Sequence, residues 1–424
     1  MRMNKKKEIV PKLRFPEFSK SYWGITRLNV LADKITERNK DDSIKRVFTN
    51  SATEGVINQE EYFDRNIANK NNLTNYFVVE KGDYVYNPRI STTAPVGPIS
   101  KNKLGIGVMS PLYTVFRFRN KENDFYEHFF LTNLWHVYIK NLSNTGARHD
   151  RITISVDNFM KMPLPYASPE EQQKIADCLS SIDDLIDAES RKLKALEKYK
   201  KGLMQKLFPA EGKTLPEWRF PEFQGCGEWQ KSTIAEVTSY VDYRGKTPVK
   251  SKDGVFLITA KNIKMGYIDY NASKEYIPKE QYSAVMSRGI PQLGDVLITT
   301  EAPCGNVAQI DKVDVALAQR VIKYRGDKNK INNTFLKYVF LSPVFQSELK
   351  KNSTGGIVGG IKGSVLHQMS IKYPDDITEQ QKIVGCLSEV DTIITEQSNK
   401  VEQLKAHKKG LMQGLFPSLE EADV

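Results

Sequence analysis

The sequence is poor in the residues that build metal sites and disulfide frameworks. Among 424 residues there are only five histidines and four cysteines, namely Cys178, Cys226, Cys304 and Cys386. The cysteines form no CxxC pair and the histidines are scattered, so we expect neither a zinc site nor a disulfide framework. Cys178 and Cys386 are most simply packing residues. This usage indicates a protein of the reducing cytoplasm.

Long apolar runs are also lacking. No stretch approaches 18 consecutive apolar residues, so we expect no transmembrane helix. Residues 1–10 form a basic N-terminal arm, but no apolar segment follows it and we predict no secretory signal. With 40% hydrophobic and 27% charged residues, the composition is that of a globular protein with room for two or three domains.

Positive charge is in excess, and it is unevenly distributed. The net charge is +11, of which residues 11–165 carry +6 and residues 210–374 carry +7. Residues 166–209 are neutral, and residues 375–424 carry −5. A basic surface suits a polyanion, usually a nucleic acid, although many basic proteins bind none.

Internal duplication is the strongest pattern in the sequence. Arg14-Phe15-Pro16-Glu17-Phe18 with Trp23 recurs as Arg219-Phe220-Pro221-Glu222-Phe223 with Trp229. The segment Glu171-Gln-Gln-Lys-Ile175 recurs at 379–383, and Lys200-Lys-Gly-Leu-Met-Gln205 recurs at 408–413, each copy of the latter being followed by Leu-Phe-Pro. The period is too long for a solenoid, so these repeats predict a tandem of two large units.

Each repeat ends in a segment with the heptad pattern of a coiled-coil helix. Acidic residues dominate the first half of each helix and lysines dominate the second half, which favours an antiparallel pair with Lys200 near Asp391 and Lys408 near Asp183. The helix dipole alone is an alternative explanation for this gradient. Glu189 and Lys200 interrupt the seam, either to fix its register or to face a partner. The predicted seam residues are Ile175, Leu179, Ile182, Leu193, Leu196, Leu203, Ile383, Leu387, Val390, Val401, Leu404 and Leu411.

The segments between these motifs are predicted to be mixed α/β. Residues 76–79 with 82–86, and residues 294–298, are expected to be short strands bounded by turns. Stretches near 126–139 and 335–349 have helical periodicity. The two units share little sequence here, so the frame is copied while the contents differ.

Together these motifs resemble the specificity subunits of type I restriction-modification systems, and the match covers essentially the whole chain. The resemblance implies two mixed α/β target-recognition domains (α+β class) in an inverted, pseudo-two-fold arrangement, joined by two long helices that form an antiparallel coiled coil. The domains would then be a basic arm (1–10), a first target-recognition domain (11–165), a central helix (166–209), a second target-recognition domain (210–374), a C-terminal helix (375–417) and a tail (418–424).

The resemblance also implies a function and partners. The chain would read a bipartite, asymmetric site in double-stranded DNA, with half-sites about one helical turn apart, roughly 34–36 Å. It would scaffold two modification subunits and the motor-nuclease restriction subunits. S-adenosylmethionine, ATP and magnesium would be bound by those partners, and this chain would hold no cofactor and catalyse nothing.

Polar loops rich in arginine, amide and hydroxyl residues are the candidate DNA contacts, because arginine pairs with guanine and asparagine with adenine. Such loops are also common as solvated turns, and most DNA hydrogen bonds go to phosphate. The candidates are Arg89, Ser91, Thr92, Asn144, Thr145, Arg148 and Arg151 in the first domain, and Tyr243, Arg244, Lys246, Lys261, Asn262, Arg320 and Lys362 in the second.

Two other kinds of protein agree less well with this sequence. An autonomous restriction enzyme or methyltransferase would need a cofactor or metal constellation. The glycine-rich segment 355–362 lacks the ending of a phosphate-binding loop, and Asn87-Pro88-Arg89-Ile90 does not match a methyltransferase catalytic loop. A structural tandem coiled-coil protein would leave the basic charge of the two domains unexplained, and absent or salt-insensitive DNA binding would favour it.

Overall fold

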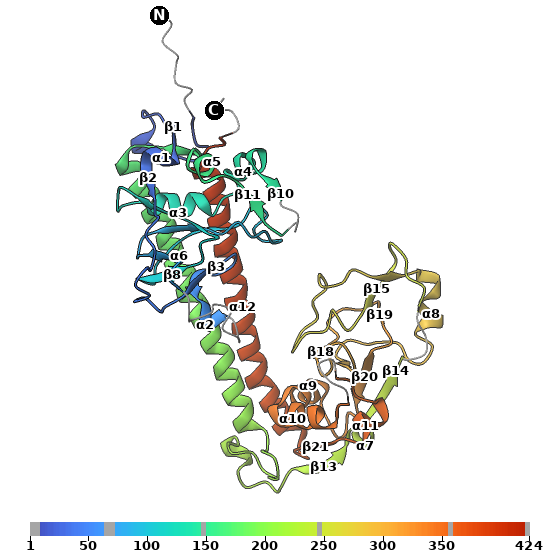
Figure 1. Cartoon of the computed structure of the whole chain (residues 1–424). Helices are drawn as coiled ribbons and strands as arrows, with labels where there is room; N and C mark the ends of the chain where they lie inside the picture. Colours follow the sequence, from blue (N-terminus) through green and yellow to red (C-terminus); the bar gives the residue numbers. More distant parts are fainter. Residues whose placement is uncertain (1–8, 63–72, 146–149, 244–247, 355–358, 420–424) are drawn as a thin grey trace, which may run out of the picture. The chain divides into compact units, whose positions relative to one another are not determined.

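The computed structural model describes residues 9–62, 73–145, 150–243, 248–354 and 359–419. The chain divides into two compact units: unit 1 comprises Met1–Glu189 and Lys400–Val424, and unit 2 comprises Ser190–Asn399. Two 39-residue helices, α6 (Pro169–Leu207) and α12 (Ile377–Leu415), contribute to both units (Figure 1).

The remaining elements are short. Those of unit 1 are η1 (Pro16–Phe18), β1 (Gly24–Arg27), α1 (Leu28–Leu31), β2 (Ala32–Lys34), β3 (Phe48–Ser51), β4 (Gly55–Asn58), α2 (Gln59–Tyr62), β5 (Phe77–Val79), β6 (Tyr84–Tyr86), β7 (Ile99–Lys101), β8 (Gly107–Met109), β9 (Thr114–Phe118), α3 (Asp124–Phe130), α4 (His136–Leu142), β10 (Asn144–Thr145), β11 (Ile152–Thr153), α5 (Val156–Met160) and β12 (Pro163–Tyr166). Those of unit 2 are η2 (Pro221–Phe223), β13 (Gln230–Thr233), α7 (Ile234–Val237), β14 (Thr238–Asp242), β15 (Val255–Ile258), β16 (Tyr276–Ile277), η3 (Lys279–Gln281), α8 (Tyr282–Val285), β17 (Val296–Thr299), β18 (Val307–Gln309), β19 (Val315–Leu317), β20 (Val321–Gly326), α9 (Asn333–Leu341), α10 (Pro343–Asn352), α11 (Gly363–Gln368) and β21 (Ser370–Tyr373).

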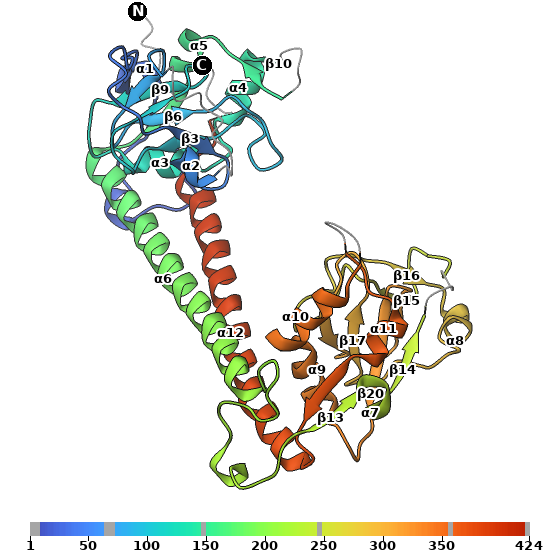
Figure 2. The same cartoon turned by 60° about the horizontal axis from the view of Figure 1, so that its bottom comes forward.

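The two units share one sheet topology although their sequences differ. Unit 1 has an antiparallel four-stranded sheet in the order β2-β9-β6-β7, and unit 2 has the same arrangement as β14-β20-β17-β18. Each unit also pairs its entry and exit strands, β1 with β12 and β13 with β21. Figure 2 shows the unit 2 strands with α9 packed beside them. This confirms the predicted mixed α/β fold.

The expected strands form, but each expected helix is broken into two. The stretch near 126–139 forms α3 and α4, and the stretch near 335–349 forms α9 and α10. In unit 2 the break has a local cause, because Pro343 cannot continue a helix and Ser342 caps the next one, accepting from the Phe345 amide at 3.3 Å.

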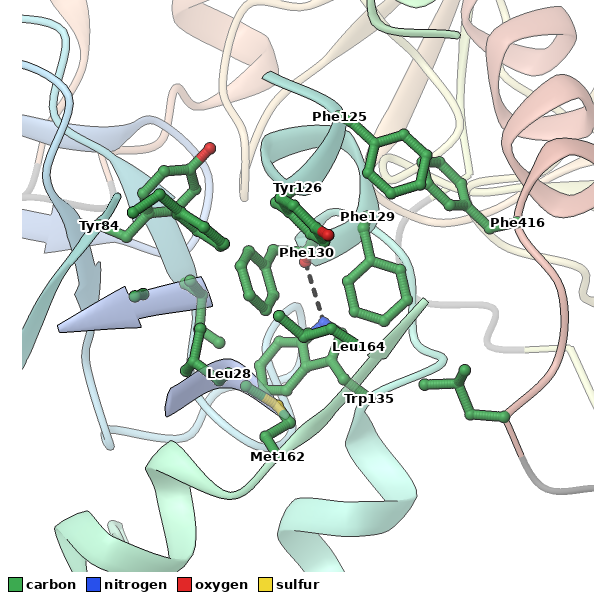
Figure 3. Packing of buried hydrophobic residues seen from close by; sticks show 14 of the residues in the cluster. Leu28, Tyr84, Phe125, Tyr126, Phe129, Phe130, Trp135, Met162, Leu164 and Phe416 are labelled. Atoms are coloured by element: carbon green, nitrogen blue, oxygen red, sulfur yellow. Dashed lines mark hydrogen bonds between the residues drawn. The ribbon is translucent and has the colours of Figure 1, made fainter. Parts of the chain in front are cut away.

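The core of unit 1 is built on aromatic rings, several of which come from the repeated motifs (Figure 3). Trp23, which follows the first motif, lies 5.6 Å from Phe125 between ring centroids. Phe416 of the Leu-Phe-Pro motif lies 5.1 Å from Phe125 and 5.8 Å from Phe129. The end of α12 is therefore fixed to α3 by ring packing.

Unit 2 repeats this cluster with the matching residues. Phe208 lies 5.6 Å from Phe335 and 6.1 Å from Trp229, and Trp229 lies 5.9 Å from Phe335. The duplicated tryptophan and the duplicated Leu-Phe-Pro thus have the same role in both units, which is to fix the end of a long helix to α3 in unit 1 and to α9 in unit 2.

The arginine that opens each repeated motif forms a buried ion pair with the glutamate that opens the next one. Arg14 donates to both carboxylate oxygens of Glu171 at 2.7 and 2.8 Å, and Arg219 does the same to Glu379 at 2.8 and 2.7 Å. The two glutamates are 0% and 1% exposed. We call these pairs the twin clamps.

The long helices pair antiparallel within each unit. In unit 1, Lys408 binds Asp183 at 2.6 Å and Lys400 binds Glu189. In unit 2, Lys200 binds Asp391. The two predicted lysine–aspartate pairs are therefore confirmed. Glu189 and Lys200 both contact the facing helix, which favours the register explanation for these seam breaks.

In each unit a short helix also contacts the long helix at or beside the lysine–aspartate pair. Tyr338 of α9 donates to Asp391 at 2.8 Å and lies 3.1 Å from the Ser388 hydroxyl. His128 of α3 lies 3.1 Å from the Ser180 hydroxyl, the matching position of the other helix. The predicted seam residues are all buried or half-buried: Ile175, Leu179, Ile182, Leu193, Leu196, Leu203, Ile383, Leu387, Val390, Val401, Leu404 and Leu411.

Candidate nucleic-acid interface

A buried aspartate marks the start of the central strand in each unit. Asp83 precedes β6 and Asp295 precedes β17, each directly after a glycine with positive φ, Gly82 or Gly294. Both aspartates are 0% exposed. Their carboxylates accept a backbone N–H three residues earlier, at 2.7 Å from Glu80 and 2.8 Å from Gln292, which closes the turn.

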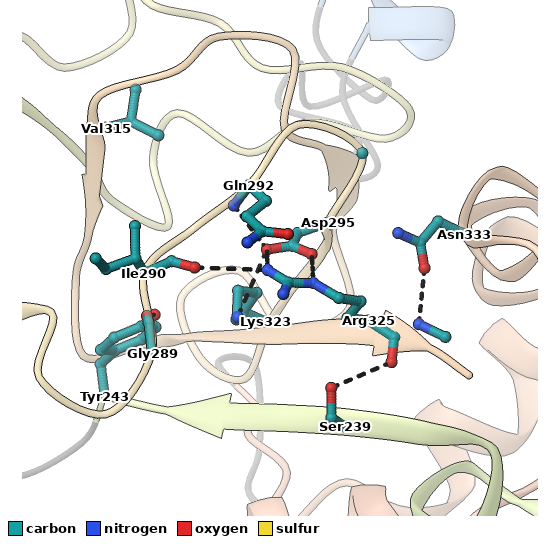
Figure 4. Close-up of polar contacts among 12 residues, drawn as sticks. Ser239, Tyr243, Gly289, Ile290, Gln292, Asp295, Val315, Lys323, Arg325 and Asn333 are labelled. Atoms are coloured by element: carbon teal, nitrogen blue, oxygen red, sulfur yellow. Dashed lines mark hydrogen bonds and ion pairs between the residues drawn. The ribbon is translucent and has the colours of Figure 1, made fainter. Parts of the chain in front are cut away.

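Each aspartate also holds an arginine on the neighbouring strand. Asp83 accepts from Arg117 of β9 at 2.5 and 3.0 Å, and Asp295 accepts from Arg325 of β20 at 2.6 and 2.8 Å (Figure 4). The carboxylates raise the pKa of both arginines. Burial lowers the pKa of Lys323, although its ammonium lies 3.5 Å from Asp295. These bonds hold the central strand in place and so position the loop that follows it.

In unit 1 this loop meets the second predicted loop. The Ile90 amide donates to the Asp150 carbonyl, and the Ile152 amide donates to the Pro88 carbonyl, both at 3.0 Å. Arg89 and Arg151 consequently oppose each other as an antiparallel bridge. Two segments that the sequence could only name separately therefore form one surface.

Unit 2 forms the same junction with other side chains. The Ile361 amide donates to the Thr300 carbonyl at 3.0 Å, and Glu301 opposes Gly360 as an antiparallel bridge. The Thr300 amide donates to the Arg320 carbonyl at 3.1 Å, and the Arg320 guanidinium lies 3.6 Å from the Glu301 carboxylate. We call this junction, in either unit, the loop–hairpin surface.

The structure brings part of the predicted DNA contacts to these surfaces. Arg89, Ser91, Thr92, Arg320 and Lys362 are exposed, and Arg151 is half-buried. The Ser91 hydroxyl also accepts from the Ala94 amide at 3.1 Å, which stabilises the turn. Lys261 is exposed in the turn after β15. The backbones of Asn144 and Thr145 form β10, but their side chains, and all of Arg148, Arg244 and Lys246, lie outside the described residues.

Two predicted contacts are wrong, because their side chains are internal. Tyr243 is 2% exposed, packs in a hydrophobic cluster and donates to the Gly289 carbonyl. Asn262 is 0% exposed, and its amide is fully used. It accepts from the Thr259 amide at 3.0 Å and donates to the Asp269 and Ser273 carbonyls at 2.9 and 2.8 Å. Both residues shape loops of unit 2 and leave no group for a base.

Glu301, which occupies the junction in unit 2, is not among the predicted contacts, because these were basic, amide, hydroxyl and aromatic residues. A signal was present, since Arg89 and Glu301 each lie six residues after the aspartate of a Gly-Asp pair, Asp83 or Asp295. The match becomes meaningful only once the two aspartates are known to hold equivalent strands.

Two general features of the described residues bear on the kind of site. They contain no group of three or more histidine, cysteine, aspartate or glutamate side chains placed to hold a metal ion. In that part of the chain, no helix combines the length and the apolar character needed to cross a membrane.

Comparison with known proteins identifies related chains. The family model described as "Type I restriction modification DNA specificity domain" matches twice, at residues 26–198 and 227–405. The MjaVIII type I restriction enzyme specificity subunit of Methanocaldococcus jannaschii is 27% identical over 321 residues, 72% of each chain. The putative MjaX specificity subunit of that organism is 24% identical over 69% of this chain and 68% of its own.

Solved structures show the same fold. A type I restriction-modification S subunit from M. genitalium is 14% identical, with a TM-score of 0.58 over 97% of this chain and 100% of that chain. A chain from a study of assembly and conformational transition in a type I restriction-modification system is 16% identical, with a TM-score of 0.54 over 93% of this chain and 96% of that one.

Proposed function

Because the chain belongs to the family of type I restriction-modification DNA specificity domains, with two copies over most of its length, we propose that its two units read the two halves of one bipartite DNA site. The general function of the chain follows from its family. The chain is a specificity subunit, the non-catalytic subunit that recognises the DNA sequence in these systems.

One observation supports two separate readers. The loop–hairpin surface has the same backbone junction in both units, at Pro88–Ile152 and at Thr300–Ile361, but it carries different side chains. A common backbone with different side chains is what two half-sites of unrelated sequence require, because base identity is read by side chains in the groove.

The partners follow from the same assignment. We propose that the paired helices α6 and α12 dock two modification subunits and that the restriction subunits join this assembly. S-adenosylmethionine, ATP and magnesium would then be bound by those partners and none by this chain. The length of the helix pair would set the number of unread base pairs between the half-sites.

The test is co-expression with the cognate modification subunit, followed by a genome-wide map of N6-methyladenine. We expect methylation at one bipartite motif with a fixed spacer. Exchanging residues 11–165 for those of another specificity subunit should change one half of that motif and leave the other half and the spacer intact. A complex that assembles but methylates no defined motif would contradict the proposal and leave only a scaffolding role.

A further inference from the structure

We propose that the residue six positions after the buried aspartate is a base-reading position in both units, and that its charge is opposite in the two. Arg89, with Arg151 opposite, would read guanine, whereas Glu301, with Gly360 opposite, would read cytosine through its amino group. This inference rests on the proposed function and adds to it the chemistry of one base pair in each half-site.

The two positions are equivalent by structure. Asp83 and Asp295 hold matching strands, so a count of six residues from each reaches Arg89 and Glu301. The preceding carbonyls, of Pro88 and Thr300, accept the same kind of bond at the same length, 3.0 Å, from an isoleucine amide. Whatever part of the DNA faces Arg89 in one half-site therefore has its counterpart facing Glu301 in the other.

In unit 1 this position concentrates positive charge. The hydrogen bonds to Ile90 and Ile152 flank the bridge, so Arg89 and Arg151 form a non-hydrogen-bonded pair, the arrangement that brings opposite side chains closest. Like charges directly opposite each other destabilise a strand pair. Among the described residues, no carboxylate forms an ion pair with either guanidinium. Two unneutralised arginines suit an acceptor-rich target, and guanine offers O6 and N7 together.

In unit 2 the same position presents a carboxylate. A Cβ added at Gly360 would lie 3.1 Å from Cγ of Glu301, so the glycine leaves the space over which the glutamate side chain extends. The Glu301 side chain is 49% exposed, and the ion pair that it forms among the described residues is with Arg320 at 3.6 Å, which is longer than a charge-assisted hydrogen bond. Its oxygens consequently keep most of their capacity to accept.

Electrostatics decide which part of DNA such a carboxylate can face. Phosphates repel a carboxylate, so Glu301 is suited to a base edge rather than to the backbone. Glutamate accepts from cytosine N4 in the major groove, whereas glutamine, which also donates, pairs with adenine N6 and N7. Changing Glu301 to glutamine should therefore change the preferred base as well as the strength of binding.

The experiment uses the full chain in complex with its modification subunit and S-adenosylmethionine. The wild-type motif is mapped first. For each position of the unit 2 half-site, methylation by Glu301→Gln is then measured on four duplexes that carry the four possible base pairs at that position and are otherwise identical. We expect one position that requires cytosine in the wild type to lose roughly tenfold or more of its discrimination, with adenine becoming the favoured substitute. Glu280→Gln, an exposed glutamate of the same unit, is the matched control and should change nothing.

Two further variants separate base reading from indirect effects. Arg320→Gln breaks the same ion pair and should weaken methylation on all four duplexes alike. Arg89→Gln combined with Arg151→Gln should relax one guanine position in the other half-site only, with Arg27→Gln as the exposed control.

The outcomes are distinguishable. A wild-type complex with no motif overturns the proposed function itself. A clear wild-type motif that Glu301→Gln leaves unchanged, or that it weakens equally for all four bases, overturns the base-reading position while the function stands. If Arg320→Gln produces the same change in the preferred base, the role assigned to Glu301 is overturned. If the position that loses discrimination is not a cytosine in the wild-type motif, the chemistry assigned to Glu301 is overturned.

Discussion

The twin clamps give one prediction that can be tested separately in each unit. Glu379 is 1% exposed and accepts two bonds from Arg219, which is 10% exposed, together with one from the Trp229 indole at 3.3 Å. Glu379→Gln keeps the shape of the side chain but removes its charge and leaves the guanidinium facing a neutral amide. Removing one member of a buried ion pair typically costs about 3–5 kcal/mol, because the remaining charge is left uncompensated.

The structure places this variant near the lower limit of that range. Arg219 keeps two acceptors, the carbonyls of Cys226 at 2.8 Å and Gly227 at 3.0 Å, so its charge does not lose every partner. We therefore expect a loss of about 3 kcal/mol. For a unit of about 200 residues, where 1 kcal/mol shifts Tm by roughly 2–4 °C, this is a drop of about 6–12 °C.

The assay is calorimetric unfolding of the full chain, with hydrogen exchange to locate the loss. Glu379→Gln should increase exchange in unit 2, and Glu171→Gln should do so in unit 1 by a comparable amount. The matched control is Glu222→Gln in the motif that contains Arg219, because Glu222 pairs with Lys382 on the surface and such pairs contribute little. A Tm change for Glu379→Gln no larger than that of the control would refute the reasoning.

Three further predictions concern residues of unit 1, two of them on or beside the helix pair and one in the sheet. Lys408→Asp should destabilise unit 1 by about 1 kcal/mol, and adding Asp183→Lys should restore most of the loss in urea unfolding; no recovery would argue against a direct pair. Burial and the nearby Lys408 lower the pKa of His128 to about 4. As pH falls from about 6.5 to 4, this histidine therefore takes up a proton in the unfolded state but not in the folded state. Up to about 3 kcal/mol of the free energy of unfolding should be lost over that pH range. The His128→Gln variant should not show this loss. Asp83→Asn, which weakens the bonds to Arg117 and leaves that guanidinium its pair with Glu80, should lower methylation through the unit 1 half-site, and an unaffected methylation rate would contradict the positioning role.

The long helices and the motifs at their ends could be predicted from the sequence because the same residues occur in both repeats. The charge order along the helices predicted the Lys408–Asp183 and Lys200–Asp391 pairs, since a parallel pairing would set like charges together. The twin clamps were present as repeated letters, but no local rule links Arg14 to Glu171 across 157 residues. The structure shows why both residues recur, since they form the same buried ion pair in each unit.

The loop–hairpin surfaces, which we propose to read DNA, were harder to predict, because local composition does not determine burial. Tyr243 and Asn262 have the residue types of a DNA contact, yet tertiary packing places both inside unit 2. Glu301 has the opposite charge to the residues that were sought. Its position became recognisable only after the strands on either side of it were matched with those around Arg89.

The bond that anchors each loop–hairpin surface has a consequence for how such proteins diversify. The carbonyls of Pro88 and Thr300 are held by the amides of Ile152 and Ile361, so the anchor involves backbone atoms alone. It does not depend on the side chain at the next position, which is arginine in one unit and glutamate in the other. Side chains at these positions can therefore change without loss of the anchor, and under the base-reading role proposed above such changes would give new DNA targets without destabilising the fold.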